Sequence, residues 1–150
     1  MLFIFMGQSC TGKSTAADKL KEQMNVEIYS GKDYLRMAKN ESEAWKLFYD
    51  KLEKAASNKD KSKESIIYVI TEIELLNRVK AIEDAYMIKF NAPLEIIKTR
   101  FADRMNGRLP QPVEKMIEKQ YLEWESVTGD LNIDTSDNDM EEIIDFILAL

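Results

Sequence analysis

The sequence of 150 residues contains no histidine and only one cysteine, Cys10. Without histidine the chain has neither a Ser-His-Asp triad nor a histidine general base. It also lacks the mixed cysteine and histidine ligands of a typical zinc site. A single cysteine excludes an internal disulfide framework.

Long apolar runs and an excess of positive charge are missing as well. The first apolar run, Leu2–Met6, is too short for the hydrophobic core of a signal peptide, and no segment is long and apolar enough to span a bilayer. A net charge of −6 argues against a surface that binds duplex nucleic acid, although local basic residues can still bind small phosphates. We therefore expect one domain over residues 1–150 that is cytoplasmic, a monomer or a homodimer, and without a membrane or a nucleic-acid duplex among its partners.

The most specific motif is the segment GQSCTGKS, which runs from Gly7 to Ser14 and fits G-x-x-x-x-G-K-[ST] without a mismatch. The apolar run Leu2–Met6 precedes it and a helical pattern follows, which is the context that a P-loop requires. The motif predicts that Lys13 reaches the β- and γ-phosphates of ATP and that the Ser14 hydroxyl ligates Mg²⁺. The expected nucleotide-binding residues are Gly7, Ser9, Cys10, Thr11, Gly12, Lys13, Ser14 and Thr15.

Cys10 inside this loop has two interpretations. Nearby N–H dipoles and Lys13 would lower the pKa of its thiol, or Cys10 is simply a small side chain that fits the loop. We favour the second interpretation, because phosphoryl transfer needs no thiol nucleophile.

Apolar runs alternate with helical patterns along the whole chain, which predicts an α/β fold with a parallel sheet. The expected strands are nearly continuous apolar segments, as in strands that are covered on both faces: Leu2–Met6, Val26–Tyr29, Ile66–Ile70, Ala85–Phe90 and Leu131–Ile133. Residues 33–57 form a long helical stretch that we interpret as an acceptor-side insert. Asn138 and Glu141 resemble a capping box for the last helix.

Asp33 and Arg36 follow the second expected strand. Ligands of parallel sheets gather beyond the carboxyl ends of the strands, so these residues should face the same crevice as the P-loop. Asp33 is then a candidate general base or a candidate support for Mg²⁺, and Arg36 is a candidate anchor for an anionic acceptor. The alternative is a helix-capping Asp followed by a solvated Arg.

Arg100, Arg104 and Arg108 recur at a spacing of four residues and lead into a short Gly/Pro loop. Arginines stabilise the charge of a transferred phosphoryl group, so we expect a lid over residues 104–112, with Arg104 and Arg108 as catalytic residues and Arg100 as a substrate contact. The alternative is a solvated basic face that pairs with Glu95 and Asp103. The third strand ends in Thr71-Glu72 and not in the aspartate that often supports Mg²⁺, for which Glu72 is a weak substitute.

Taken together, these segments resemble the small P-loop kinases of the nucleoside monophosphate, shikimate and gluconate kinase group. The stretch from Ser30 to Arg36 is similar to the acceptor motif of adenylate kinases and to the Arg-Asp-Asp-x-Arg element of polynucleotide kinases, in which the Asp is the base. The stretches Ala92–Arg104 and Asp130–Ser136 resemble the lid region and the loop near the adenine. The resemblance implies a three-layer P-loop NTPase fold, with a five-stranded parallel sheet in the order 2-3-1-4-5.

The resemblance also implies transfer of the γ-phosphoryl group of ATP to a small-molecule acceptor, with Mg²⁺ as cofactor. We favour a nucleotide or nucleoside as the acceptor, and a sugar or sugar acid is the second candidate. A P-loop NTPase or nucleotide-binding regulatory protein without kinase activity is the alternative of another class. Recognition of guanine by a GTPase is not supported, because the segment Asn58–Lys61 lacks an Asp two residues after Lys59.

Overall fold

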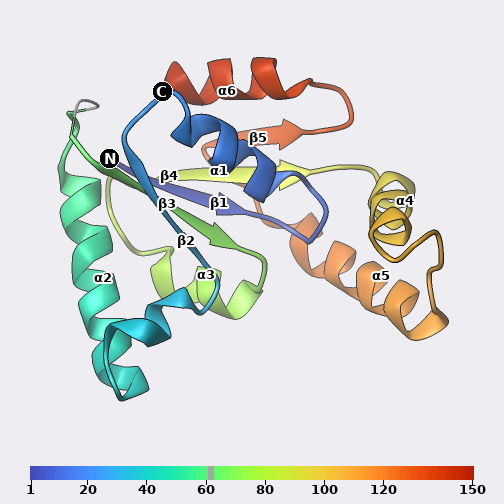
Figure 1. Cartoon of the computed structure of the whole chain (residues 1–150), viewed down its shortest axis with the longest axis horizontal. Helices are drawn as coiled ribbons and strands as arrows, with labels where there is room; N and C mark the ends of the chain where they lie inside the picture. Colours follow the sequence, from blue (N-terminus) through green and yellow to red (C-terminus); the bar gives the residue numbers. More distant parts are fainter. Residues whose placement is uncertain (61–62) are drawn as a thin grey trace.

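The chain folds around one five-stranded parallel sheet (Figure 1). The computed structural model describes residues 1–60 and 63–150, so Lys61 and Ser62 of the polar run after residue 57 lie outside the described residues. The sheet has the order β2-β3-β1-β4-β5, as predicted. Its strands are β1 (Leu2–Met6), β2 (Val26–Ser30), β3 (Ser65–Ile70), β4 (Tyr86–Asn91) and β5 (Leu131–Asp134). Each predicted strand boundary is correct to within one residue.

The sheet separates two apolar cores because alternate side chains of a strand point to opposite faces. Leu2, Ile4 and Met6 pack with α2 (Glu41–Ser57) and α3 (Ile73–Val79) on one face. Phe3 and Phe5 pack with α1 (Lys13–Lys21) and α6 (Met140–Leu148) on the other. Figure 1 shows these two helical layers on either side of the sheet. Every residue of β1 and β3 is buried, which explains their uninterrupted apolar sequences.

The helical stretch after β2 is two helices and not one. A 3-10 helix, η1, spans Asp33–Met37, and α2 begins at Glu41. Between them Ala38 is extended, and the Asn40 side chain caps α2 by accepting a hydrogen bond of 2.9 Å from the Glu43 N–H. The break arises because an asparagine side chain satisfies a helix-terminal N–H better than it serves inside a helix.

The capping box predicted for the last helix is wrong by one residue. Asp139, and not Asn138, caps α6, and its carboxylate accepts a hydrogen bond of 2.9 Å from the Glu142 N–H. The Asn138 side chain instead donates to the carbonyl of Asp134. Asp and Asn are almost equally good caps, so the local sequence could not distinguish the two registers.

Helices α4 (Leu94–Arg104) and α5 (Gln111–Glu125) form a hairpin beyond the carboxyl ends of the strands (Figure 1). A third small core of Cys10, Ala92, Ile97 and Ile117 holds this hairpin against the loop after β1. Within the described part of the chain, no helix is both long and apolar enough to cross a bilayer.

Candidate active site

The loop between β1 and α1 has the backbone that a P-loop requires. Gly7 has a φ of +145°, and a Cβ atom there would lie 2.4 Å from the carbonyl oxygen of Phe90. Gly12 has a φ of +92°, and its Cβ would lie 3.2 Å from a methyl group of Thr135. The neighbouring strand and loop therefore leave no room for a side chain at Gly7 and little at Gly12, and the loop can curl tightly before α1.

Lys13 lies buried at the start of α1, folded back over the loop. Its Nζ donates a hydrogen bond of 2.6 Å to the carbonyl oxygen of Gln8 and lies 3.5 Å from the hydroxyl of Thr11. Burial lowers the pKa of Lys13 to about 7; Cys10 acts in the opposite direction, and the charge of Arg104 adds a smaller lowering effect. An anion in front of the loop would therefore stabilise the protonated form of Lys13.

A cleft of about 120 Å³ opens directly in front of the loop. Ser14 and Thr15 are exposed in it at the first turn of α1, and among the described residues the Ser14 hydroxyl has no hydrogen-bond partner. An unengaged hydroxyl at this position suits a ligand of Mg²⁺. The lining residues are Ser9, Cys10, Gly12, Lys13, Ser14, Thr15, Thr71 and Arg104. We call this the phosphate cleft.

A second hollow of about 320 Å³ adjoins the phosphate cleft and shares Cys10, Gly12, Thr15 and Arg104 with it. It extends over Arg100 and Thr135 to the beginning of α6.

The three arginines of the predicted lid have different places. Arg100 reaches back from α4 and donates to the carbonyl of Cys10 at 3.0 Å and to the hydroxyl of Thr135 at 2.8 Å. Arg104 lines both hollows. Arg108 is exposed in the turn between α4 and α5 and lines neither hollow.

Arg100 thus connects α4 to the P-loop and to the loop after β5 through hydrogen bonds. The ion pair with Glu95 that the alternative interpretation assigned to this helix face is made by Lys98, at 3.8 Å. Lys98 also contacts Glu114 at 3.1 Å and Glu118 at 3.3 Å, which joins α4 to α5. The period of four residues placed these side chains on a helix but could not tell which of them turns inward.

Cys10 is almost completely buried, with an exposed fraction of 5%. Burial raises the pKa of its thiol above the ordinary value, although the charges of Arg104, Lys13 and Arg100 act in the opposite direction. The interpretation that Cys10 has a lowered pKa is therefore wrong, because desolvation outweighs the nearby cations. Cys10 is a small loop side chain whose positive φ of 65° fits the tight turn.

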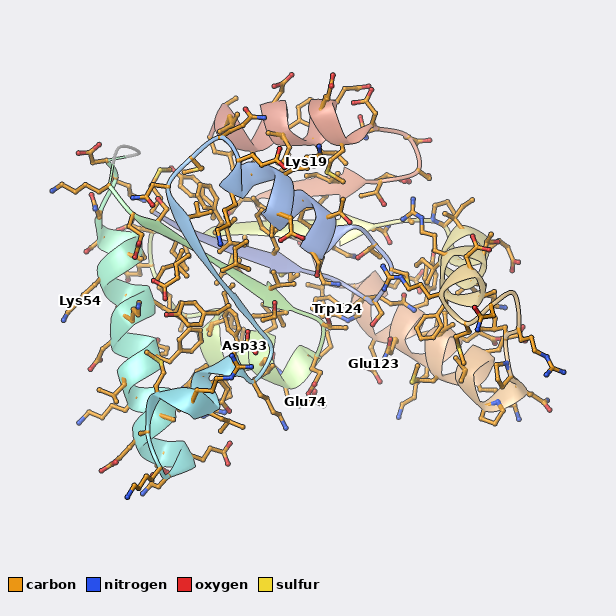
Figure 2. All side chains as sticks on the ribbon, viewed as in Figure 1. Lys19, Asp33, Lys54, Glu74, Glu123 and Trp124 are labelled. Carbon is orange, nitrogen blue, oxygen red and sulfur yellow. The ribbon has the colours of Figure 1, made fainter. Side chains whose placement is uncertain are left out.

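Asp33 and Arg36 lie on η1, immediately after β2. The carboxylate of Asp33 accepts a hydrogen bond of 2.9 Å from the Ser30 N–H, which holds it where β2 passes into η1 (Figure 2). Asp33 is partly exposed and Arg36 is exposed. Neither residue lines the phosphate cleft, so the structure does not bring them into the cleft in front of the P-loop, where the sequence predicted them.

Arg78, Tyr34 and Tyr68 make further polar contacts around η1. The Arg78 guanidinium lies 3.8 Å from the ring centre of Trp45 and donates a hydrogen bond of 3.2 Å to the Tyr34 hydroxyl. The Tyr68 hydroxyl donates to the carbonyl of Gly31 at 2.7 Å. The aromatic stripe of α2 predicted packing, but nothing in the sequence singled out Arg78, because it stands alone on α3.

The charges around Tyr68 show which groups gather there. Burial raises the pKa of Tyr68, and the negative charges of Asp33 and Glu72 act in the same direction, whereas Arg78 opposes them. Asp33, Glu72 and Arg78 therefore share one neighbourhood at the carboxyl ends of β2 and β3. Glu72 is the N-cap residue of α3 and belongs to this group, and it does not line the phosphate cleft.

No protein-family model and no curated protein matches this chain. Solved structures match it over nearly its whole length. A shikimate kinase from Aquifex aeolicus is 19% identical, with a TM-score of 0.56 over 99% of this chain and 94% of that one. The tunicamycin resistance protein of Deinococcus radiodurans is 17% identical, with a TM-score of 0.64 over 99% and 93%.

The YorR protein of Bacillus subtilis, solved in complex with phosphorylated GDP, is 24% identical, with a TM-score of 0.62 over 99% of this chain and 94% of that one. Identities at this level show a common fold. The sheet order, the intact P-loop and the coverage of both chains agree, so this chain has the fold of the small P-loop kinases that the sequence resembles.

Proposed function

We propose that this protein is an ATP-dependent phosphotransferase that moves the γ-phosphoryl group of ATP to a small acceptor, a nucleotide or a nucleoside. The observation that carries the proposal is the phosphate cleft, in which an intact P-loop faces Arg104 from a different helix. A cation on a hairpin opposite a P-loop is the arrangement that phosphoryl transfer needs, because the transition state spreads negative charge over the equatorial oxygens.

The donor side would be formed by the P-loop and the second hollow. The loop amides and Lys13 bind the phosphates of ATP, and the nucleoside part lies toward Thr135 and the start of α6. The Ser14 hydroxyl holds Mg²⁺, which supplies neutralisation of the phosphate charge when it is bound. Arg100 fixes the P-loop relative to the loop after β5, since it contacts both Cys10 and Thr135.

The acceptor side would be formed by η1 and α3. Asp33 takes the proton of an acceptor hydroxyl while that oxygen bonds to the γ-phosphorus and the bond from phosphorus to the oxygen of ADP breaks. For a phosphate acceptor no base is needed, and Arg36 binds its charge. Closure of the lid over residues 104–112 adds Arg108 to Arg104 at the transferred group.

Two alternatives remain testable. A sugar or sugar acid is the second candidate acceptor, favoured by the short turn between α4 and α5 and by the fold shared with shikimate kinase. The nucleotide acceptor is supported by the fold shared with YorR, whose structure holds phosphorylated GDP. A nucleotide-binding protein without kinase activity is the alternative of another class, and it is motivated by the missing acid at the end of β3.

The test is a screen of nucleosides, nucleotides, sugars and sugar acids, measured by coupled release of ADP from Mg·ATP and by thermal shift. We expect ADP release above the basal rate with at least one nucleoside or nucleotide. Release only with sugars or sugar acids would select the second candidate. Stabilisation by ATP without any acceptor-dependent release would select the protein without kinase activity.

Alkylation of Cys10 should block nucleotide binding, and bound Mg·ATP should protect against it. The reason is steric, because an adduct on Cys10 enters the space shared by the two hollows. Reaction should be slow at neutral pH and faster at alkaline pH, because burial raises the pKa of the thiol. Mass spectrometry measures the modification, and calorimetry measures the binding of ATP.

The matched control is Cys10→Ser, which should bind ATP and resist the reagent. Full affinity for ATP after stoichiometric modification of Cys10 would show that the loop from Gly7 to Ser14 does not surround the phosphates.

Arg104→Ala and Arg36→Ala should affect different kinetic constants. Arg104 lines the phosphate cleft, so its loss should lower kcat by about 10²-fold with a small change in the KM of ATP. Arg36 lies on η1, so its loss should mainly raise the KM of the acceptor. Lys119→Ala, a charge removal at an exposed position of α5, is the control and should change neither. The reverse pattern would mean that the donor and acceptor sides are exchanged.

A further inference from the structure

The end of β3 carries a neutral residue at the edge of the phosphate cleft. Thr71 follows the last residue of β3 directly and lines the cleft together with Lys13 and Ser14. In many P-loop enzymes a carboxylate at this strand end holds Mg²⁺. Of the residues that the structure describes, no Asp or Glu lines the phosphate cleft.

The position of Thr71 is held by contacts from two directions. The Gly7 N–H donates to the carbonyl of Ile70 at 3.2 Å, which joins the end of β3 to the start of the P-loop. The indole N–H of Trp124, on α5, donates to the carbonyl of Thr71 at 3.0 Å. Trp124 is buried, and Lys89 in turn donates to its carbonyl at 2.6 Å. Two hydrogen bonds therefore hold the backbone at position 71, beside the cleft that Thr71 lines.

Three acidic residues outside the phosphate cleft have other contacts. Asp33 accepts a hydrogen bond from the Ser30 N–H and does not line the cleft. Glu72 belongs to the neighbourhood of Tyr68 on the acceptor side. Asp139, an acid that lines the second hollow, accepts a hydrogen bond from the N–H of Glu142 and caps α6. The phosphate cleft thus combines two basic side chains, Lys13 and Arg104, and no carboxylate lines it within the described part of the chain.

We infer that this cleft binds the phosphates of its nucleotide mainly through protein cations, and that Thr71 makes the affinity for ATP nearly independent of Mg²⁺. The inference rests on the proposed function and deepens it. A carboxylate at position 71 would repel the metal-free phosphates and attract the metal complex, whereas the threonine hydroxyl does neither and serves only as a hydrogen-bonding partner for a metal-bound water. Mg²⁺ bound by Ser14 still supplies charge neutralisation in the transfer step.

The test compares the Kd of ATP in excess Mg²⁺ and in excess EDTA, by calorimetry at constant ionic strength. For the natural protein the two values should differ by less than about tenfold. Thr71→Asp should raise the ratio of the EDTA value to the Mg²⁺ value by about 10- to 100-fold, through weaker binding in EDTA. Thr71→Asn introduces a side chain of the same size as aspartate but without its charge. It should leave the ratio near that of the natural protein.

Tryptophan fluorescence, which comes from Trp45 and Trp124 together, reports whether each variant keeps its fold, and Trp124 contacts the backbone of residue 71 directly. A ratio above about tenfold in the natural protein would overturn the inference. An equal ratio in the folded Asp and Asn variants would show that position 71 does not face the metal. No binding of ATP under either condition would instead reject the proposed function, and the inference would fall with it.

Discussion

Replacement of Lys13 by methionine should lower turnover by about 10³-fold while the nucleotide-free protein stays folded and becomes more stable. The loss of turnover follows from the role proposed for the ammonium group, which would bind the phosphates and stabilise the charge that develops in the transition state. The gain in stability follows from burial. Lys13 has an exposed fraction of 5%, and its ammonium group contacts only neutral oxygen atoms among the described residues.

The pH dependence of stability has a definite sign at this residue. The pKa of Lys13 is about 7 in the folded protein and ordinary in the unfolded chain, so the unfolded chain binds more protons between about pH 7 and pH 10.5. The contribution of Lys13 to the free energy of unfolding therefore rises with pH across this window. Lys13→Met removes this dependence, and thermal unfolding at several pH values measures the difference between the two proteins.

Binding of a nucleotide should reverse the protonation of Lys13. At pH 8 the free protein holds this lysine mostly neutral, and the phosphates of ATP raise its pKa, so binding should take up close to one proton. Calorimetry in two buffers of different ionisation enthalpy measures this uptake, which Lys13→Met should abolish. A folded Lys13→Met variant with a turnover near that of the natural protein would contradict the proposed phosphotransferase.

Asp33→Asn should lower kcat by about 10²- to 10⁴-fold if the acceptor is a hydroxyl compound. The asparagine oxygen can still accept the hydrogen bond from the Ser30 N–H, so the turn between β2 and η1 is retained. The variant therefore removes the base and keeps the local structure. Steady-state kinetics with the acceptor found in the screen measure kcat and both KM values.

Asp130→Asn is the matched control for this variant. The carboxylate of Asp130 also accepts a hydrogen bond from a backbone N–H, that of Met87, but it precedes β5 and so lies at the opposite edge of the sheet. Asp130→Asn should leave kcat unchanged.

A loss confined to the KM of Mg·ATP in Asp33→Asn would assign Asp33 to the donor side. No effect on any constant would make Asp33 a structural residue of the turn.

Local sequence was sufficient for the strands and the P-loop because both are short-range features. Strands that are covered on both faces need apolar residues at nearly every position, so β1 and β3 stand out as continuous runs. The start of α6 and the break at Asn40 were less predictable. In both places a single side-chain hydrogen bond decides the register, and several neighbouring polar residues could have made it.

The candidate site was predictable only in part for the same reason. The lid arginines were found by their spacing of four residues, yet the spacing could not show that Arg100 turns inward to Cys10 while Arg108 remains exposed. Arg78 had no periodic partner, and its place above Trp45 depends on how α3 packs against α2. Side-chain direction across two elements is a property of their packing, and no short window of sequence contains it.

The sequence by itself determined the P-loop, because the residues from Gly7 to Ser14 specify a phosphate-binding turn wherever a strand and a helix flank them. Tertiary structure alone decided the electrostatics of that turn. Burial lowers the pKa of Lys13 and raises that of Cys10, and the cleft is closed by Thr71 and Arg104 from distant segments. Desolvation and charge depend on which atoms surround a group in space, and those atoms come together only when the sheet and the hairpin have formed.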